Sequence, residues 1–386
     1  MLQRSMSCTF ELTIHFNAVH ATQVMLTGLL SSLTMHAHRC RRIAVCSGTK
    51  NVQLCQVTKT IRDFDWHFPA LRSVEVADFS RSEQGGYHRI QFIPFWKDAD
   101  DQIESLDIEF ADEWQRFDSI NSAEGLHVPT RNLKQLRICE GSGFTMEVIV
   151  NLLHCCPSLT HFEWSSNDDM DPFESESILL PCLTSLRING FALGALFPPT
   201  ITPKCTQLCL HESTPHSNDR FLHFSPDTMR EFPSLKQFSL QHPDGFTTKL
   251  HRFLSVHSSI EEMLMHGPDC DAEADGTECC EVFDGLAYAS GEGSLAASKE
   301  GSPILPKLRV LWYLAFMEFW KDDWEDVAWI VALVSAIRRL LLHRPSLIIK
   351  MPIVLRGSNN VPHEFRDLQN EFMTQFFVLD GKARPE

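Results

Sequence analysis

The sequence lacks a hydrophobic run long enough to cross a bilayer. Its longest apolar stretch, residues 327–337, is shorter than the ~20 residues that a transmembrane helix needs, and Arg338 and Arg339 follow it. Residues 10–16 alternate between polar and apolar side chains instead of forming the apolar block of a signal peptide. We therefore expect a protein that neither spans a membrane nor is secreted.

Basic residues are also scarce, with 34 Lys and Arg against 50 Asp and Glu, a net charge of −16. The acid is concentrated, since residues 98–124 hold ten Asp and Glu against one Arg, and residues 266–302 hold nine against one Lys. A nucleic-acid-binding protein needs a basic stripe to neutralise phosphates. We therefore expect no nucleic acid among the partners, and we interpret the cluster of Arg39, Arg41 and Arg42 as a solvated edge.

The motifs of common enzymes are missing. The sequence has no Walker A loop, no G-x-G-x-x-G after a strand, no G-x-S-x-G elbow and no H-E-x-x-H. Its 18 His are scattered, and the adjacent pair Cys155-Cys156 differs from the spaced pairs of structural zinc sites. An EF-hand-like start at 271–276 lacks the closing Glu, because Val282 stands there. We expect no catalytic residues, no metal and no cofactor.

The 13 Cys form an odd number, and several lie within apolar patterns. Reduced, buried thiols of a cytoplasmic or nuclear protein explain them better than a disulfide framework does.

One short sequence motif, which we call the phrase, occurs ten times in the sequence. It consists of an apolar residue, two free positions, an apolar residue, one free position and another apolar residue, as in Leu183-Thr-Ser-Leu186-Arg-Ile188. The end of the phrase alternates with period two, which is typical of a strand with one buried face. The copies begin at residues 40, 71, 103, 133, 159, 183, 205, 235, 260 and 308, so all spacings but the last lie between 22 and 32 residues.

Proline stands two residues before several of these phrases, where it ends the preceding helix and turns the chain into a strand. A unit this short cannot bury its own apolar face, so neighbouring units must stack. The spacing is typical of leucine-rich repeats. We predict an α/β fold, an irregular leucine-rich-repeat solenoid with parallel strands on the concave face and helices or irregular returns on the convex face. The alternative is an ordinary sandwich or α/β domain whose strands are alike by chance.

Four regions follow from this pattern. We predict an N-terminal strand and capping helix at 1–36, a repeat solenoid at 37–266, an acidic disordered insertion at 267–304, and the last repeats with a C-terminal helical cap at 305–386. A further strand is possible at 347–349. Helices are predicted at 21–35, 52–64, 145–154, 225–232, 247–256, 323–343 and 363–373.

The free positions of the strands would line the concave face, which is the usual binding surface of a solenoid. Their mixed polar character suits a protein or peptide partner better than a small molecule, because no apolar pocket is implied. The candidate partner-binding residues are Glu75, Asp107, Glu109, Gln135, Arg137, His161, Glu163, Arg187, Asn189, Gln237 and Glu262.

The segments 38–43, 68–71, 180–183 and 305–311 resemble fungal F-box proteins with divergent leucine-rich repeats. The resemblance implies that the repeats bind a protein substrate and that an F-box docks a Skp1-type adaptor of an SCF ubiquitin ligase. It covers the repeat region only, because the residues before Phe10 leave no room for the helical F-box. Gly141 and Phe191 also stand where ordinary leucine-rich repeats place Asn. The adaptor is therefore expected as a partner only if an F-box is missing from this sequence.

We expect a non-catalytic protein-interaction module, an F-box-type substrate receptor or an F-box-less relative. The alternative is an enzyme or small-ligand-binding α/β domain of an unrecognised family. That alternative requires a deep pocket near Gly141 and Gly143, where a turn between strand and helix could cradle a phosphate.

Overall fold

The structure is a computed structural model, and its elements fall into two units, 1–204 and 205–386, which are described separately. The residues that it describes are 8–16, 23–47, 60–61, 63–64, 66–78, 88–89, 102–110, 115–116, 131–140, 146–166, 177–190, 200–211, 232–241, 248–266, 277–287, 304–318, 328–356 and 362–380.

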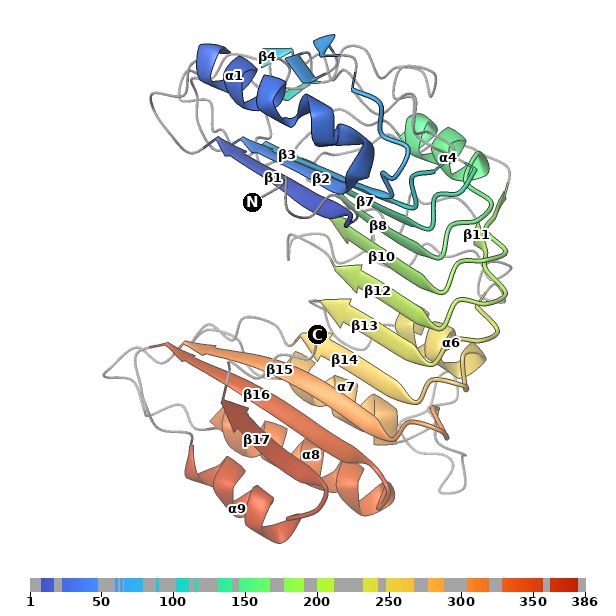
Figure 1. Cartoon of the computed structure of the whole chain (residues 1–386). Coiled ribbons are helices and arrows are strands. Elements are labelled where there is room, and N and C mark those ends of the chain that lie inside the picture. The colour runs from blue at the N-terminus through green and yellow to red at the C-terminus, as the bar shows by residue number, and fades with distance from the viewer. Residues whose placement is uncertain are drawn as a thin grey trace. The chain divides into compact units, whose positions relative to one another are not determined.

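Parallel strands in chain order form the sheet of the first unit (Figure 1). Each strand pairs with the next one listed, and the pairing of β10 with β8 keeps Ser185 opposite His161 and Ile188 opposite Trp164. The strands are β1 (Phe10–Phe16), β2 (Cys40–Ser47), β3 (Ser73–Asp78), β5 (Ser105–Phe110), β7 (Gln135–Glu140), β8 (His161–Ser166) and β10 (Ser185–Gly190). Two short parallel pairs accompany them: β4 (His88–Arg89) with β6 (Gln115–Arg116), and β9 (Ile178–Leu179) with β11 (Thr200–Ile201).

The second unit repeats this arrangement. Its strands are again parallel and again pair in chain order. They are β12 (Gln207–His211), β13 (Gln237–Gln241), β14 (Glu262–His266), β15 (Val310–Glu318), β16 (Ile348–Arg356) and β17 (Phe376–Asp380). All ten phrases of the sequence thus coincide with strands, and the further strand expected at 347–349 is confirmed as β16. Sequential parallel pairing is compatible with a repeat solenoid and differs from the antiparallel sheets of an ordinary sandwich.

The apolar positions of the phrase form continuous buried rows. Leu106, Leu136, Phe162 and Leu186 lie opposite one another on successive strands, and each is 1–2% exposed. Leu133, two residues before β7, is completely buried, as are the first residues of most other phrases. Burying one such side chain contributes ~1.5–3 kcal/mol. Each strand therefore depends on its neighbours for its buried surface.

A tight turn leads into each of several strands. The N–H of Leu235 donates to the carbonyl of Phe232 at 3.1 Å across Pro233, and Leu159 bonds to Cys156 in the same way across Pro157 at 3.2 Å. Proline suits the second position of such a turn because its φ is fixed near the required value. The residue before the proline is buried in both turns. The predicted role of proline at the strand entrance is confirmed here.

Helices cover the apolar face of the strands. In the first unit they are α1 (Gln23–Leu33), the 3₁₀ helix η2 (Thr34–Arg39) and α4 (Met146–His154). In the second they are α6 (Thr248–Val256), α7 (Thr277–Ala287), α8 (Ala328–His343) and α9 (His363–Glu371). The prediction for 247–256 is confirmed, with Leu250, Phe253 and Leu254 buried. The helix predicted at 225–232 lies outside the described residues apart from Phe232, and that at 52–64 is described only at residues 60, 61, 63 and 64.

Three predictions require correction. Residues 277–287 of the presumed disordered insertion form α7, whose Val282, Phe283 and Leu286 are at most 2% exposed; residues 267–276 and 288–303 lie outside the description. The C-terminal region does not end as a helical cap, because β17 follows α9 and extends the sheet. Leu29, an apolar residue of the helix that we predicted at 21–35 and expected on its buried side, is 46% exposed in α1. In α7 the buried apolar face outweighs the acidic composition of the segment.

None of the helices in the described ranges is both long enough and apolar enough to cross a membrane.

Candidate interaction surface

The candidate residues of the first unit lie on one face of the sheet, opposite the buried rows. We call this face, formed by the free positions of β1 to β10, the polar strand face. Period two places Glu75, Asp107, Arg137, Glu163 and Arg187 in one register row across five strands. The sequence therefore predicted correctly that these side chains gather on one surface.

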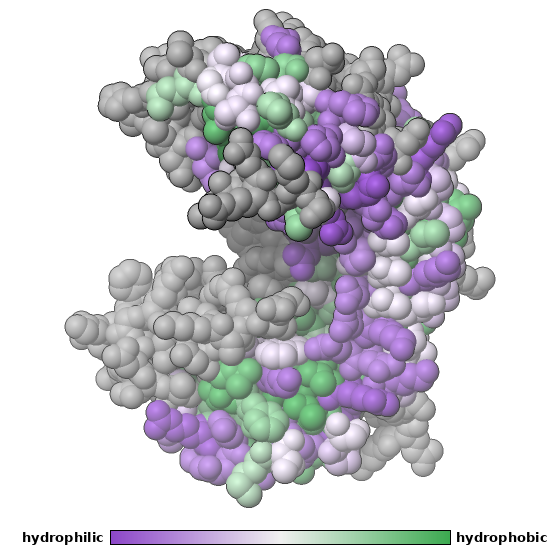
Figure 2. Space-filling view, viewed as in Figure 1, coloured by the Kyte–Doolittle hydropathy of each residue, from purple (hydrophilic) through white to green (hydrophobic). Residues whose placement is uncertain are grey.

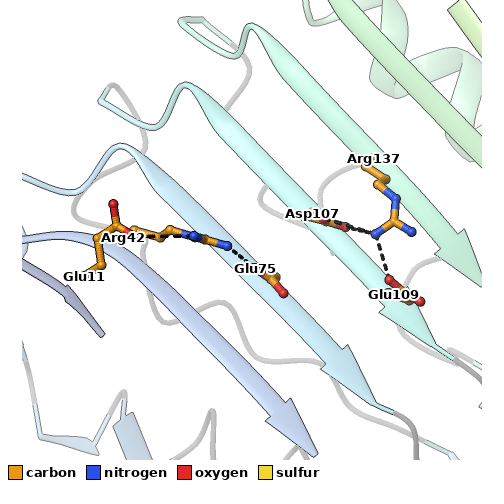
Figure 3. Close-up of polar contacts among 6 residues, drawn as sticks. All are labelled: Glu11, Arg42, Glu75, Asp107, Glu109 and Arg137. Atoms are coloured by element: carbon orange, nitrogen blue, oxygen red, sulfur yellow. Dashed lines mark hydrogen bonds and ion pairs between the residues drawn. The ribbon is translucent and has the colours of Figure 1, made fainter. Parts of the chain in front are cut away.

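Arg137 organises the centre of this row (Figure 3). Its Nη1 donates to Asp107 at 3.1 Å and 3.2 Å and to Glu109 at 2.7 Å. Its Nε lies 3.7 Å from Glu163 Oε1, which in turn lies 3.8 Å from Arg187 Nη1. Three carboxylates thus surround two guanidinium groups across four strands.

A second ion network occupies the N-terminal strands. Arg42 reaches from β2 to Glu75 at 2.6 Å and to Glu11 at 3.4 Å, so one cation joins three neighbouring strands (Figure 3). Arg42, which the sequence reading assigned to a solvated edge, is therefore part of the surface. Its place in the phrase is equivalent to that of Ser73, and this register could have identified it.

Burial of this face is partial. The side chains of Asp107, Glu163 and Arg187 are 30%, 25% and 46% exposed. Burial raises the pKa of Asp107 above its ordinary value, while Arg137 acts in the opposite direction. Ion pairs at this exposure contribute ~0–1 kcal/mol each. The networks therefore set a pattern of charge on the surface more than they hold the fold together.

A row of polar side chains at the strand entrances borders this face. Lys134 Nζ donates to Glu104 Oε2 at 2.8 Å, and Arg72 Nη1 donates to Gln102 at 2.8 Å. The hydrogen bond from Lys134 lowers the pKa of Glu104. These contacts link successive repeats at the positions where each strand begins.

Three candidate residues, His161, Asn189 and Gln135, stand apart from the ion networks. His161 is the first residue of β8, and its Nδ1 is 2.9 Å from the hydroxyl of its neighbour Thr160. Asn189 contributes a buried Oδ1 that accepts no hydrogen bond from the described residues. Gln135 is exposed and lies opposite His161. These three are available side chains rather than parts of a network.

The second unit carries a hydrogen-bonded chain of its own. Gln207 donates to Gln237 at 2.6 Å, and Gln237 donates to Glu262 at 2.9 Å. The indole Nε1 of Trp312 also donates to Glu262, at 2.8 Å, and Lys350 Nζ lies 4.4 Å from the centre of the Trp312 ring. The sequence reading named Gln237 and Glu262 but missed the other three. Trp312 occupies the same free position as Glu75, so the phrase itself contained the signal.

The described residues form no group of three or more His, Cys, Asp or Glu side chains arranged to hold a metal ion. Cys155 is exposed and Cys156 buried, although they are adjacent. The segment from Gly141 to Gly143, on which the ligand-binding alternative depends, lies outside the described residues. The chemistry present on the described surface is therefore that of charge and hydrogen-bond recognition.

No protein-family model matches this chain, and no curated protein is significantly similar to it in sequence.

Proposed function

We propose that this chain is a non-catalytic protein-interaction module of the leucine-rich-repeat type, and that the polar strand face contacts its partner. The observation that carries the proposal is the register row from Glu75 to Arg187, which places one part-exposed polar side chain on each of five successive strands. An array of oriented charges suits a protein surface, because charge complementarity selects partners and speeds association. The repeat spacing supports the leucine-rich-repeat assignment.

The finer proposal is a substrate receptor of an SCF ubiquitin ligase, supported by the resemblance to fungal F-box proteins. In that role the repeats hold the substrate, and a Skp1-type adaptor binds through an F-box. Mixing the purified chain with a purified Skp1-type adaptor tests it. A stable complex supports the receptor role, whereas a chain that keeps a strand-face partner but does not bind the adaptor is an interaction module without that role.

The general proposal is tested by charge reversal on the two faces of the first unit. Proteins captured by the tagged chain are compared with those captured by Glu163→Lys on the polar strand face and by Glu147→Lys on the exposed side of α4. We expect partners that are lost with Glu163→Lys and kept with Glu147→Lys. Melting curves of both variants establish that the fold is intact. Partners lost only with Glu147→Lys would contradict the proposal.

A further inference from the structure

The free positions change character along the second unit. On β12 and β13 they carry polar side chains such as Gln207, Gln237 and Ser239, as in the first unit. On the last strands the same positions become largely apolar. One register row contains Leu264, Trp312, Lys350 and Phe377, and the row beside it contains Val310 and Ile348. We call these six residues the Trp312 patch.

The Trp312 patch lies on the face that the helices leave uncovered. The alternate residues Leu311 and Tyr313 point to the other face and are at most 2% exposed, and Phe283 of α7 packs on Tyr313 with ring centres 4.9 Å apart. The six patch residues, in contrast, each keep part of their surface exposed. Figure 2 shows hydrophobic surface over strands β15–β17.

The patch ends along the strands where burial becomes complete. Leu314 and Pro352, the next residues on the same side of β15 and β16, are both buried. On β15 and β16 the exposed apolar surface is therefore confined to the neighbourhood of the indole ring, as at an anchor site.

Trp312 is held in place before any partner arrives. Its Nε1 donates to Glu262, and the ammonium group of Lys350 stands over its ring. An aromatic side chain fixed in this way loses little rotamer entropy when a partner packs against it. Tryptophan is also the residue type most enriched among side chains that dominate binding energy.

The charges around the ring are not equivalent. Glu262 already accepts hydrogen bonds from two donors, Gln237 and Trp312. Lys350 contacts the ring but lies within ion-pair distance of no carboxylate among the described residues. A ligand with a carboxylate beside its apolar side chain would therefore complement the patch.

We propose that the Trp312 patch binds a peptide segment of a protein partner, with an aromatic or aliphatic side chain against Trp312 and an Asp or Glu at Lys350. This inference rests on the proposed interaction function and adds a second surface with a stated ligand chemistry. It differs from the polar strand face, where recognition depends on charge and hydrogen bonds.

Selection from a displayed library of random peptides, with the full chain as target, tests the proposal. Selected peptides should combine an aromatic or aliphatic residue with Asp or Glu a short distance away. Their affinities are then measured by fluorescence anisotropy. Trp312→Ala should weaken binding about tenfold or more, as truncation of a binding anchor does. Lys350→Glu should weaken the acidic peptides and favour versions in which Lys replaces the Asp or Glu.

Lys236→Glu is the matched control, because Lys236 is exposed in the same unit but lies at a strand entrance outside the patch. It should leave the affinities unchanged. Lys350→Glu replaces a part-exposed side chain and leaves the indole ring of Trp312 in the patch, so it remains informative even if Trp312→Ala fails to fold. Selected peptides without acidic enrichment, or binding that Trp312→Ala and Lys350→Glu leave intact, would overturn the inference.

If Arg187→Glu alone abolishes binding, the interaction function stands and the patch assignment is wrong. If no peptide is selected, the patch proposal is overturned, while the capture experiment decides the proposed function separately.

Discussion

The Nδ1 of His257 donates a hydrogen bond to the carbonyl of Phe253, 2.9 Å away, and the two rings stack with centres 4.3 Å apart. His257 occupies the turn position that Phe68 and Phe232 take in other repeats, three residues before the first apolar residue of the phrase. It is 3% exposed, and its Nε2 has no hydrogen-bond partner among the described residues. A buried imidazole therefore replaces a buried phenyl ring.

Burial lowers the pKa of His257 below its ordinary value of 6.5. The unfolded chain takes up this proton first as the pH falls, so the contribution of His257 to stability is complete above pH 6.5 and is lost below it. We expect the free energy of unfolding, measured with urea, to fall between neutral and mildly acidic pH. His257→Phe should reduce that fall. An equal fall in the variant would show that His257 is not the group responsible.

Truncating one side chain of a buried row should lower the free energy of unfolding. Leu136→Ala removes a side chain that is 2% exposed and should lower the free energy of unfolding by about 2–5 kcal/mol. The neighbouring substitution Gln135→Ala alters an exposed free position and should change it by about 0.5 kcal/mol or less. Urea titrations of both variants measure the contrast. Similar losses for the two would contradict the assignment of faces on β7.

Removing Arg137 should matter mainly at low salt. Arg137→Gln leaves Asp107, Glu109 and Glu163 without their shared cation, so their repulsion should lower the melting temperature slightly. High salt screens exposed charges, since the Debye length falls to about 3 Å near 1 M, and the difference from the natural protein should shrink. Arg187→Gln, which loses one contact at 3.8 Å, is the milder control. A larger effect at high salt would argue against an electrostatic role.

Adjacent thiols should differ sharply in reactivity. Burial raises the pKa of Cys156 to about 12, whereas Cys155 beside it is exposed. The thiolate is the reactive form, so iodoacetamide at neutral pH should label Cys155 well before Cys156, Cys40 or Cys139. The last two thiols also have a pKa raised by burial to about 12. Mass spectrometry of the labelled peptides measures the order. Comparable labelling of Cys155 and Cys156 would contradict the described burial.

The strands were predictable from the sequence because each repeats the same alternation and because proline marks several entrances. Strand β17 was missed, since the run Phe376-Phe377-Val378-Leu379 has no proline before it and shows no alternation. Helix α7 was missed for a different reason. Acidic composition suggested disorder, but Val282, Phe283 and Leu286 are buried, and Phe283 packs on Tyr313 of β15. Three buried side chains outweigh the surrounding charge.

The sequence could predict which face of the sheet each candidate side chain occupies, because side chains alternate between the two faces along a strand. Period two assigned Asp107, Arg137 and Glu163 to one surface, but it could not show that Arg137 would lie between two acidic strands. That arrangement depends on which strands are neighbours, which is a property of the fold. Trp312 was overlooked because an aromatic residue in an apolar strand suggests burial, although it occupies a free position of the phrase. The pairing of β15 with β16 places it in a part-exposed row.

Photo-crosslinking from two sites of similar exposure tests the central claim most directly. A benzoylphenylalanine replaces Arg187, whose side chain is 46% exposed on the polar strand face, or Val331, which is 50% exposed on α8. Partners captured by the natural protein are then irradiated with each variant. We predict crosslinks from position 187 and none from position 331. Crosslinks from position 331 alone would contradict the assignment of the strand face as the binding surface.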